Sequence, residues 1–211
     1  MIKVVPFIYN DDIDDLFSNT YVVYDDNNQA IVIDPSHKNT SISDYIKKNN
    51  LNLVGVLLTH AHFDHMRGVD ILVNEFKCPF YLFYLEEEML TNPFLNGSTL
   101  LSEKDMIVLS KPTLLKENEV LKLLDEDIHV LYTPFHTLGS VCFYFKESKL
   151  LFSGDTLFKS GIGRDDLPNN DRKNRKKSLD KLLKLDDDIK VYPGHGGLTS
   201  MKEEKPNFIY Y

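Results

Sequence analysis

The segment of residues 59–65, Thr-His-Ala-His-Phe-Asp-His, constrains the possible folds of this chain more than any other. The apolar run of residues 53–58 before it is typical of a buried strand, and residues 66–76 after it have the apolar spacing of a helix. The histidines and the aspartate therefore lie in the turn after the carboxyl end of a strand, where open α/β sheets bind ligands. We expect a metal centre at this turn.

Three further strands are predicted to end in turns that carry a histidine or an aspartate. His136 lies within residues 132–140, Asp155 within residues 152–156 and His195 within residues 192–197. Glycine, proline or serine stands close to each of these side chains, and small residues let the backbone approach closely and redirect a side chain. We expect these turns to supply the remaining ligands.

The candidate ligands divide into two groups of three and one bridging residue. They are His60, His62 and His136 in one group, Asp64, His65 and His195 in the other, and Asp155 as the bridge. Imidazole and carboxylate suit zinc, iron or manganese, and the absence of thiolates argues against a closed structural zinc site. Two metals about 3.5–4 Å apart would share a bridging water and lower its pKa, which gives a hydroxide nucleophile at neutral pH. Asp64 could orient that water or pass a proton to the leaving group.

Composition limits the other classes of function. The 211 residues suffice for one globular domain, and the net charge of -8 argues against broad binding to nucleic acid or to a membrane surface. Two cysteines are too few for a disulfide framework, which favours a reducing compartment. The first residues lack the pattern of a signal peptide, and no apolar run approaches the roughly 20 residues of a membrane span. We therefore expect a soluble, cytoplasmic protein.

The residue pattern predicts strands in both halves of the chain, with helices between them. The expected strands are residues 3–9, 20–24, 30–34, 53–58, 80–83, 120–124, 128–132, 141–145, 150–152 and 189–192. The expected helices are residues 41–50, 66–76 and 173–184, with a short helix at 86–90. The first three strands form an antiparallel meander, and residues 91–112 form a long irregular loop. This order suits two sheets packed on each other with helices outside.

Some single residues have specific expected places. Asn39, Thr40 or Ser41 is the candidate cap of the first helix, and Leu179, Leu182 and Leu183 are expected to face inward from the last one. Asp34 could either orient a ligand histidine or form a turn. His37 and His129 are expected to be structural or exposed, and Cys78 and Cys142 to be core residues.

The metal-site motifs together resemble the motif set of the metallo-β-lactamase superfamily. Residues 153–158, 161–168 and 196–208 resemble the short glyoxalase II-like hydrolases of that superfamily. The resemblance implies an α/β (α+β layered) fold, an αββα sandwich of two mixed sheets packed face to face with helices outside. It also implies one domain over residues 1–211, with the metals in a shallow cleft at one edge of the two sheets.

The same resemblance implies a hydroxyacylglutathione hydrolase-like enzyme that cleaves a small acyl thioester. It implies two divalent metal ions, zinc first, with iron or manganese as alternatives, and no nucleic-acid or membrane partner; the oligomeric state stays open. The alternative is a persulfide dioxygenase with one iron at His60, His136 and Asp155. A nuclease or another ester or lactone hydrolase ranks lower. β-Lactam cleavage is disfavoured because the most similar lactamases have Cys at the position of Asp155.

The loop after Asp155 is the expected substrate contact. In the full-length glyoxalase II enzymes a Lys and a Tyr of this loop contact the thiol carrier, and Arg164 and Asp166 stand at those positions here. Arg164 could hold a substrate carboxylate through a forked hydrogen bond. Asp166 would instead repel an anionic substrate.

Overall fold

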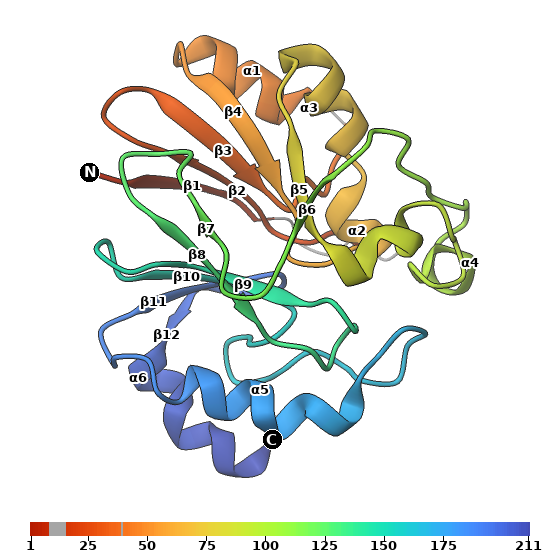
Figure 1. Cartoon of the computed structure of the whole chain (residues 1–211), viewed down its shortest axis with the longest axis vertical. Coiled ribbons are helices and arrows are strands. Elements are labelled where there is room, and N and C mark those ends of the chain that lie inside the picture. The colour runs from red at the N-terminus through yellow and green to blue at the C-terminus, as the bar shows by residue number, and fades with distance from the viewer. Residues whose placement is uncertain (9–15, 39) are drawn as a thin grey trace.

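The computed structural model describes residues 1–8, 16–38 and 40–211. Within these ranges two six-stranded sheets pack face to face, with helices on their outer faces (Figure 1). The first sheet has the order β1-β2-β3-β4-β5-β6. Its strands are β1 (Lys3–Phe7), β2 (Thr20–Tyr24), β3 (Gln29–Ile33), β4 (Asn52–Leu57), β5 (Phe80–Phe83) and β6 (Thr113–Leu115).

The second sheet has the order β12-β11-β10-β9-β8-β7. Its strands are β7 (Val120–Leu121), β8 (Ile128–Tyr132), β9 (Val141–Phe145), β10 (Leu150–Gly154), β11 (Lys190–Pro193) and β12 (Thr199–Ser200). Both sheets are mixed: β1, β2 and β3 are antiparallel, β3 to β6 are parallel, and β10 pairs with β11 in parallel. The predicted meander and the predicted sandwich are confirmed.

The helices cover the outer faces of the sheets (Figure 1). Helices α1 (Ser41–Lys48) and α3 (Val69–Phe76) cover the first sheet, and α2 (Phe63–Met66) lies at its lower end in the view. Helices α5 (Arg175–Leu182) and α6 (Met201–Glu204) cover the second sheet, whereas α4 (Ser98–Leu101) lies in the loop after β5. Three 3₁₀ helices complete the described structure: Tyr84–Leu90, Arg172–Asn174 and Lys205–Tyr210.

Alternation along the strands explains the layers. In β2, Tyr21 and Val23 belong to the cluster between the sheets, whereas Val22 belongs to the cluster beneath α1 and α3. Successive side chains of a strand point to opposite faces, so a strand buried on both faces is apolar throughout. On the second sheet, Leu151 of β10 packs outward into the cluster that contains Leu182 of α5.

The predicted helix over residues 66–76 is confirmed for Val69–Phe76, but its start is wrong, because α2 and α3 are separate helices with Arg67 and Gly68 between them. The amide of Gly68 donates to the carbonyl of Pro35 at 2.8 Å. A Cβ on Gly68 would lie 2.6 Å from the carbonyl oxygen of His37, so only glycine allows this approach. The segment after β3 therefore packs against the junction between the two helices.

The ends of several other elements differ from the prediction. Leu183 is 37% exposed rather than inward-facing, because α5 ends at Leu182. Thr40 precedes α1 without a capping bond, since its hydroxyl donates to the Asp44 carboxylate. The expected strand at 120–124 ends at Leu121. The predictions for Tyr9 and Asn39 lie outside the described residues.

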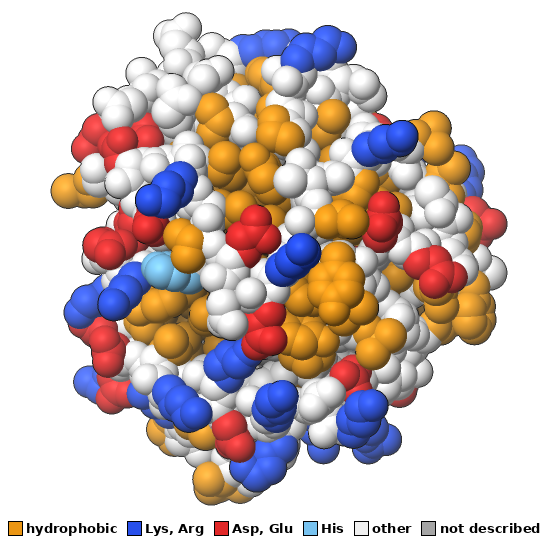
Figure 2. All heavy atoms as spheres, viewed as in Figure 1, with side chains coloured by type: hydrophobic (Ala, Val, Ile, Leu, Met, Phe, Trp, Pro, Cys, Tyr) orange, Lys and Arg blue, Asp and Glu red, His pale blue; other side chains and the backbone are white. Residues whose placement is uncertain are grey.

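Charged side chains of both signs are interspersed over the face shown in Figure 2, with Lys and Arg more frequent over α5. Among the residues that the structure describes, no helix is long and apolar enough to cross a membrane.

Candidate metal centre

All seven predicted ligands lie together at one edge of the sandwich. His60 and His62 follow β4, and α2 carries the next two, Asp64 and His65. The other three lie in the turn between β8 and β9, directly after β10 and just after β11; they are His136, Asp155 and His195. The parallel pairing of β10 with β11 brings the ends of these two strands to the same edge.

The first donor group consists of three buried histidines. His60 Nε2 lies 3.1 Å from His62 Nδ1, and His62 Nδ1 lies 2.9 Å from His136 Nε2. Their ligand atoms all lie within 4.8 Å of one another. Three nitrogens this close can occupy one face of a metal ion, as the sequence predicted for this group.

The second donor group consists of Asp64, His65 and His195. Asp64 Oδ2 lies 3.1 Å from His195 Nε2 and 3.6 Å from His65 Nε2. The carboxylate of Asp155 reaches both groups. Its Oδ1 lies 3.3 Å from His65 Nε2, and its Oδ2 lies 3.3 Å from His136 Nε2. Asp155 therefore lies between the two donor groups.

The donor set fits divalent metal ions. His65 Nε2 and Asp155 Oδ1 are buried and have no hydrogen-bond partner among the described residues. Buried polar atoms of this kind are rare, and a bound ion is one of the few things that satisfy them. The donors are nitrogen and carboxylate oxygen, a set that suits zinc, iron or manganese.

The donor groups shift one another's pKa values in opposite directions. Burial lowers the pKa of His62 to about 3, which leaves the imidazole neutral. Burial acts to raise the pKa of Asp64, but the positive charge of His65 and the hydrogen bond from His195 outweigh it and lower that pKa to about 2. Burial opposes charge on His65 as well, yet the carboxylates of Asp64 and Asp155 raise its pKa well above the usual value. A metal ion would take the place of that proton among the carboxylates.

Asp34 orients His65, so the geometry favours the first of its two expected roles. Its Oδ2 lies 3.0 Å from His65 Nδ1 and accepts the Thr59 hydroxyl at 2.6 Å, while its Oδ1 accepts the Thr59 amide at 2.8 Å. On the other side of the centre, His136 Nδ1 lies 2.7 Å from the carbonyl oxygen of Arg164. Such partners fix the ring orientation of ligand histidines.

Glu86 is a buried part of the site that sequence reasoning missed. Its Oε2 accepts the Ala61 amide at 2.8 Å, and its Oε1 accepts the Gly139 amide at 2.7 Å. The side chain thus connects the turn that carries His60 and His62 to the turn that carries His136. It lies in a run of three glutamates on a 3₁₀ helix, and nothing in that run marks one of them as inward-facing.

Glycines allow the backbone to pass close to Asp155. A Cβ on Gly194 would lie 2.1 Å from Asp155 Oδ1 and 2.8 Å from His65 Cε1. A Cβ on Gly163 would lie 2.1 Å from the Asp155 carbonyl oxygen. The expectation that small residues beside the ligands serve close approach is therefore confirmed at Gly194, and Gly163 allows a similar approach from further along the chain.

A cleft of about 340 Å³ opens over the donors. Ligand sites in proteins are of this size or larger. Donors from both groups line it, and so do four apolar side chains: Leu16, Leu101, Phe158 and Leu167. The cleft can therefore hold one small molecule against the donor atoms.

Arg164 lines the cleft but already has a carboxylate partner within its own loop. Its Nε donates to Asp166 Oδ1 at 2.6 Å, and its Nη2 donates to Asp166 Oδ2 at 2.9 Å. Asp166 thus accepts a forked hydrogen bond of the kind predicted for a substrate carboxylate, and the substrate contact of Arg164 stays a prediction.

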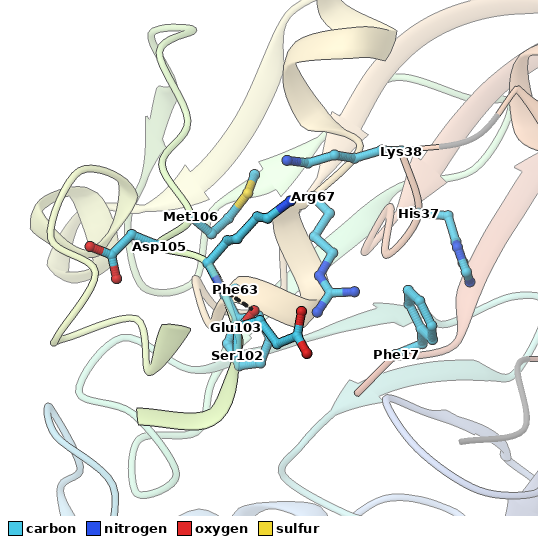
Figure 3. A pocket seen from close by; sticks show the side chains of 10 residues that line it. Phe17, His37, Lys38, Phe63, Arg67, Ser102, Glu103, Asp105 and Met106 are labelled. Atoms are coloured by element: carbon cyan, nitrogen blue, oxygen red, sulfur yellow. Dashed lines mark hydrogen bonds between the residues drawn. The ribbon is translucent and has the colours of Figure 1, made fainter. Parts of the chain in front are cut away.

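The remaining histidines lie outside the donor groups. His37 lines a separate pocket of about 440 Å³ on the other side of Phe63, and its ring stacks on Phe17 at 3.9 Å between centroids (Figure 3). His129 is half-buried in β8. Cys78 and Cys142 are buried free thiols, as expected.

Comparison with known proteins identifies the family. Residues 13–195 match the sequence profile of the metallo-β-lactamase superfamily. The chain is 36% identical over 191 residues to the probable metallo-hydrolase YqgX of Bacillus subtilis, with 89% of each chain covered. It is 34% identical over 197 residues to the hydroxyacylglutathione hydrolase GloC of Haemophilus influenzae, again with 89% of each covered. The chain belongs to the metallo-β-lactamase superfamily of metal-binding hydrolases.

Solved structures agree with this assignment. The BLEG-1 B3 metallo-β-lactamase has a TM-score of 0.88 and 34% identity, with 98% of this chain and 97% of that chain covered. TTHA1623, solved in a di-iron-bound form, has a TM-score of 0.79 and 32% identity, with 92% and 95% covered.

Proposed function

We propose that this protein is a dinuclear metal-dependent hydrolase that cleaves a small acyl thioester. The observation that carries the proposal is the position of Asp155, whose two carboxylate oxygens lie 3.3 Å from a nitrogen of each donor group. A carboxylate between two donor groups suits a pair of ions better than one ion.

The chain would hold each ion with a separate set of side chains. One set is His60, His62 and His136, the other is Asp64, His65 and His195, and Asp155 would contact both ions. Bound divalent metals supply a Lewis acid for the carbonyl group and lower the pKa of water. Zinc is the first candidate, and the di-iron form of TTHA1623 supports iron as the alternative.

The chain's own groups orient the substrate and handle the proton. The cleft would place the thioester carbonyl over the donors, and its apolar wall would keep bulk water away. Asp64, which lines the cleft, would orient the attacking water or accept its proton. Hydrolysis forms a C–O bond, breaks the C–S bond and releases the carboxylic acid and the thiol. The name of GloC supports thioester chemistry for this chain.

β-Lactam hydrolysis is the second candidate, because BLEG-1 is described as a B3 metallo-β-lactamase and covers nearly the whole chain. This likeness offsets the argument that β-lactam cleavage is disfavoured because the most similar lactamases have Cys at the position of Asp155. The persulfide dioxygenase and the nuclease gain no comparable support.

We place the protein in the cytoplasm, since its two cysteines are buried free thiols. The partner we propose is a small thioester substrate.

The test is a substrate panel with zinc-loaded or iron-loaded protein and an Asp155→Ala variant as the inactive control. The panel holds S-lactoylglutathione, the lactoyl thioester of N-acetylcysteamine, a chromogenic cephalosporin and a simple lactone. We expect metal-dependent turnover of at least one thioester at a higher kcat/KM than of the cephalosporin or the lactone. Turnover of the cephalosporin alone, or of none of the four, would overturn the proposal.

A further inference from the structure

The rim of the cleft offers little free positive charge. Arg164 is the one Lys or Arg side chain among the described residues that line it. A substrate that carries carboxylates needs cations at such a rim for electrostatic complementarity. Apart from the metal donors themselves, Arg164 is therefore the lining side chain that could pair with a carboxylate of an anionic substrate.

Asp166 occupies the hydrogen-bonding edge of Arg164. The two bonds of 2.6 and 2.9 Å form the fork by which a guanidinium otherwise binds a substrate carboxylate. The bond from Arg164 holds the pKa of the Asp166 carboxyl below its usual value, so the aspartate stays ionised. Both side chains of the pair are about half-exposed, so a ligand can reach the pair from solvent.

Nearby basic residues are also paired. Arg175 Nη1 lies 2.9 Å from Asp165 Oδ2, and Arg172 Nε lies 3.4 Å from the same oxygen. The loop of residues 164–166 thus places a carboxylate against each arginine around it.

The pocket beyond Phe63 does not supply the missing charge. Its wall carries both signs, with three cations, Lys38, Arg67 and Lys104, and two carboxylates, Glu103 and Asp105 (Figure 3). The Arg67 guanidinium stacks over the rings of Phe17 and Phe63, at 4.8 and 5.1 Å from their centroids. That pocket is therefore no strongly cationic receptor for an anionic tail.

We propose that the cleft selects thioesters of uncharged thiol carriers, with Asp166 as the specificity-determining residue. Asp166 neutralises Arg164 and occupies the fork that would bind a carboxylate, while the apolar wall of Leu16, Leu101, Phe158 and Leu167 accepts an uncharged carrier. Glutathione, with a net charge of about -1 at neutral pH, is then a poor carrier. This inference rests on the proposed thioester hydrolysis and names its substrate class.

The experiment compares two lactoyl thioesters, one of glutathione and one of N-acetylcysteamine, on metal-loaded protein. The measured quantity is the ratio of kcat/KM for the anionic to that for the neutral substrate. We expect a ratio below one for the unchanged protein and a rise of about three- to tenfold in Asp166→Ala, mainly through KM, because the freed Arg164 attracts carboxylates. The double variant Arg164→Ala/Asp166→Ala should lose most of that rise.

Asp188→Ala is the matched control. Asp188 is also an exposed aspartate in an ion pair, with Lys149, but it precedes β11, whereas His195 follows that strand. Its removal changes the net charge equally and should leave the ratio within about twofold, since charges beyond the Debye length are screened.

A second readout separates this inference from the proposed reaction. Calorimetry measures the Kd of S-methylglutathione, which cannot be hydrolysed as a thioester, and of its diethyl ester, which lacks both carboxylates. We expect Asp166→Ala to bind S-methylglutathione about three- to tenfold more tightly, with a smaller change for the ester. If neither thioester is cleaved but this difference holds, the reaction is wrong and the specificity stands. If the thioesters are cleaved, but Asp166→Ala changes neither the kcat/KM ratio nor the Kd of S-methylglutathione, the proposed specificity is wrong.

Discussion

At the scale of single residues, Glu86 links the two turns that carry the first donor group. Its carboxyl group accepts one backbone amide from each turn and is completely buried. Burial raises the pKa of Glu86 to about 7 although these bonds act to lower it. The folded protein therefore keeps a proton that the unfolded chain releases near its ordinary pKa of 4.5.

This difference predicts a pH dependence of stability. Between about pH 4.5 and 7 the folded state binds the extra proton, so the free energy of unfolding falls as pH rises, by about 3 kcal/mol in all. Glu86→Gln cannot titrate and should lack this component. Urea unfolding of both proteins with a chelator present, at pH 5, 6, 7 and 8, measures it. If the free energy of unfolding changes equally with pH in the two proteins, the raised pKa of Glu86 is not the source of this pH dependence.

Residues with a recognisable sequence context were predictable, and residues defined by a distant partner were not. The spacing of His60, His62 and their neighbours after an apolar run marked them as donors, and the structure brings them together. Arg164 was expected to face a substrate, but its guanidinium bonds to the carboxylate two residues further on. Which of the three consecutive glutamates turns inward depends on a 3₁₀ helix that the sequence does not mark.

At the scale of elements, the loop after β10 packs closely against the donor groups. The amide of Gly163 donates to the Asp155 carbonyl at 3.0 Å, and a Cβ there would also lie 3.0 Å from His136 Nδ1. The loop therefore returns against the ligands with no space for a side chain.

We expect Gly163→Ala to loosen the centre without removing a ligand. The added methyl group must displace the Asp155 backbone, at a cost of about 1–3 kcal/mol, and metal affinity should fall by about tenfold or more. Gly161→Ala is the matched control, because a Cβ at Gly161 meets nothing within 4 Å. Competition with a chromogenic chelator measures both affinities. An equal loss of metal affinity in the two variants would contradict the close approach of Gly163 to Asp155.

Elements with strong periodicity were predicted well, and short or interrupted ones were not. Strands β2, β5, β8 and β9 have the predicted bounds, because each is a short run rich in β-branched, aromatic and other apolar residues. Strands β6 and β12 have only three and two residues, too few to show alternation. The break between α2 and α3 follows from contacts of Gly68 with Pro35 and His37, which helical periodicity does not reveal.

At the scale of the whole molecule, the donor groups join the two sheets. His60 and His62 follow a strand of the first sheet, whereas His136, Asp155 and His195 follow strands of the second. A metal ion bound by ligands from both sheets stabilises the folded state, because the unfolded chain does not hold these ligands together.

Metal removal should therefore lower the melting temperature. Binding at 100 to 1,000 times Kd contributes about 3–4 kcal/mol, which corresponds to roughly 10 °C for a chain of this length. Differential scanning calorimetry before and after dialysis against a chelator checks this, and re-addition of metal should restore the melting temperature. An unchanged melting temperature would show that the donors do not hold a metal in the folded protein.

The most direct test of the dinuclear thioester hydrolase is a titration of the metal-free protein with zinc, and separately with ferrous iron under anaerobic conditions. The rate of thioester hydrolysis is followed against the metal added per chain. We predict a rate that rises to a plateau at two equivalents, because Asp155 lies between two complete donor groups. A plateau at one equivalent, or no hydrolysis at any ratio of either metal to the chain, would contradict the proposal of a dinuclear thioester hydrolase.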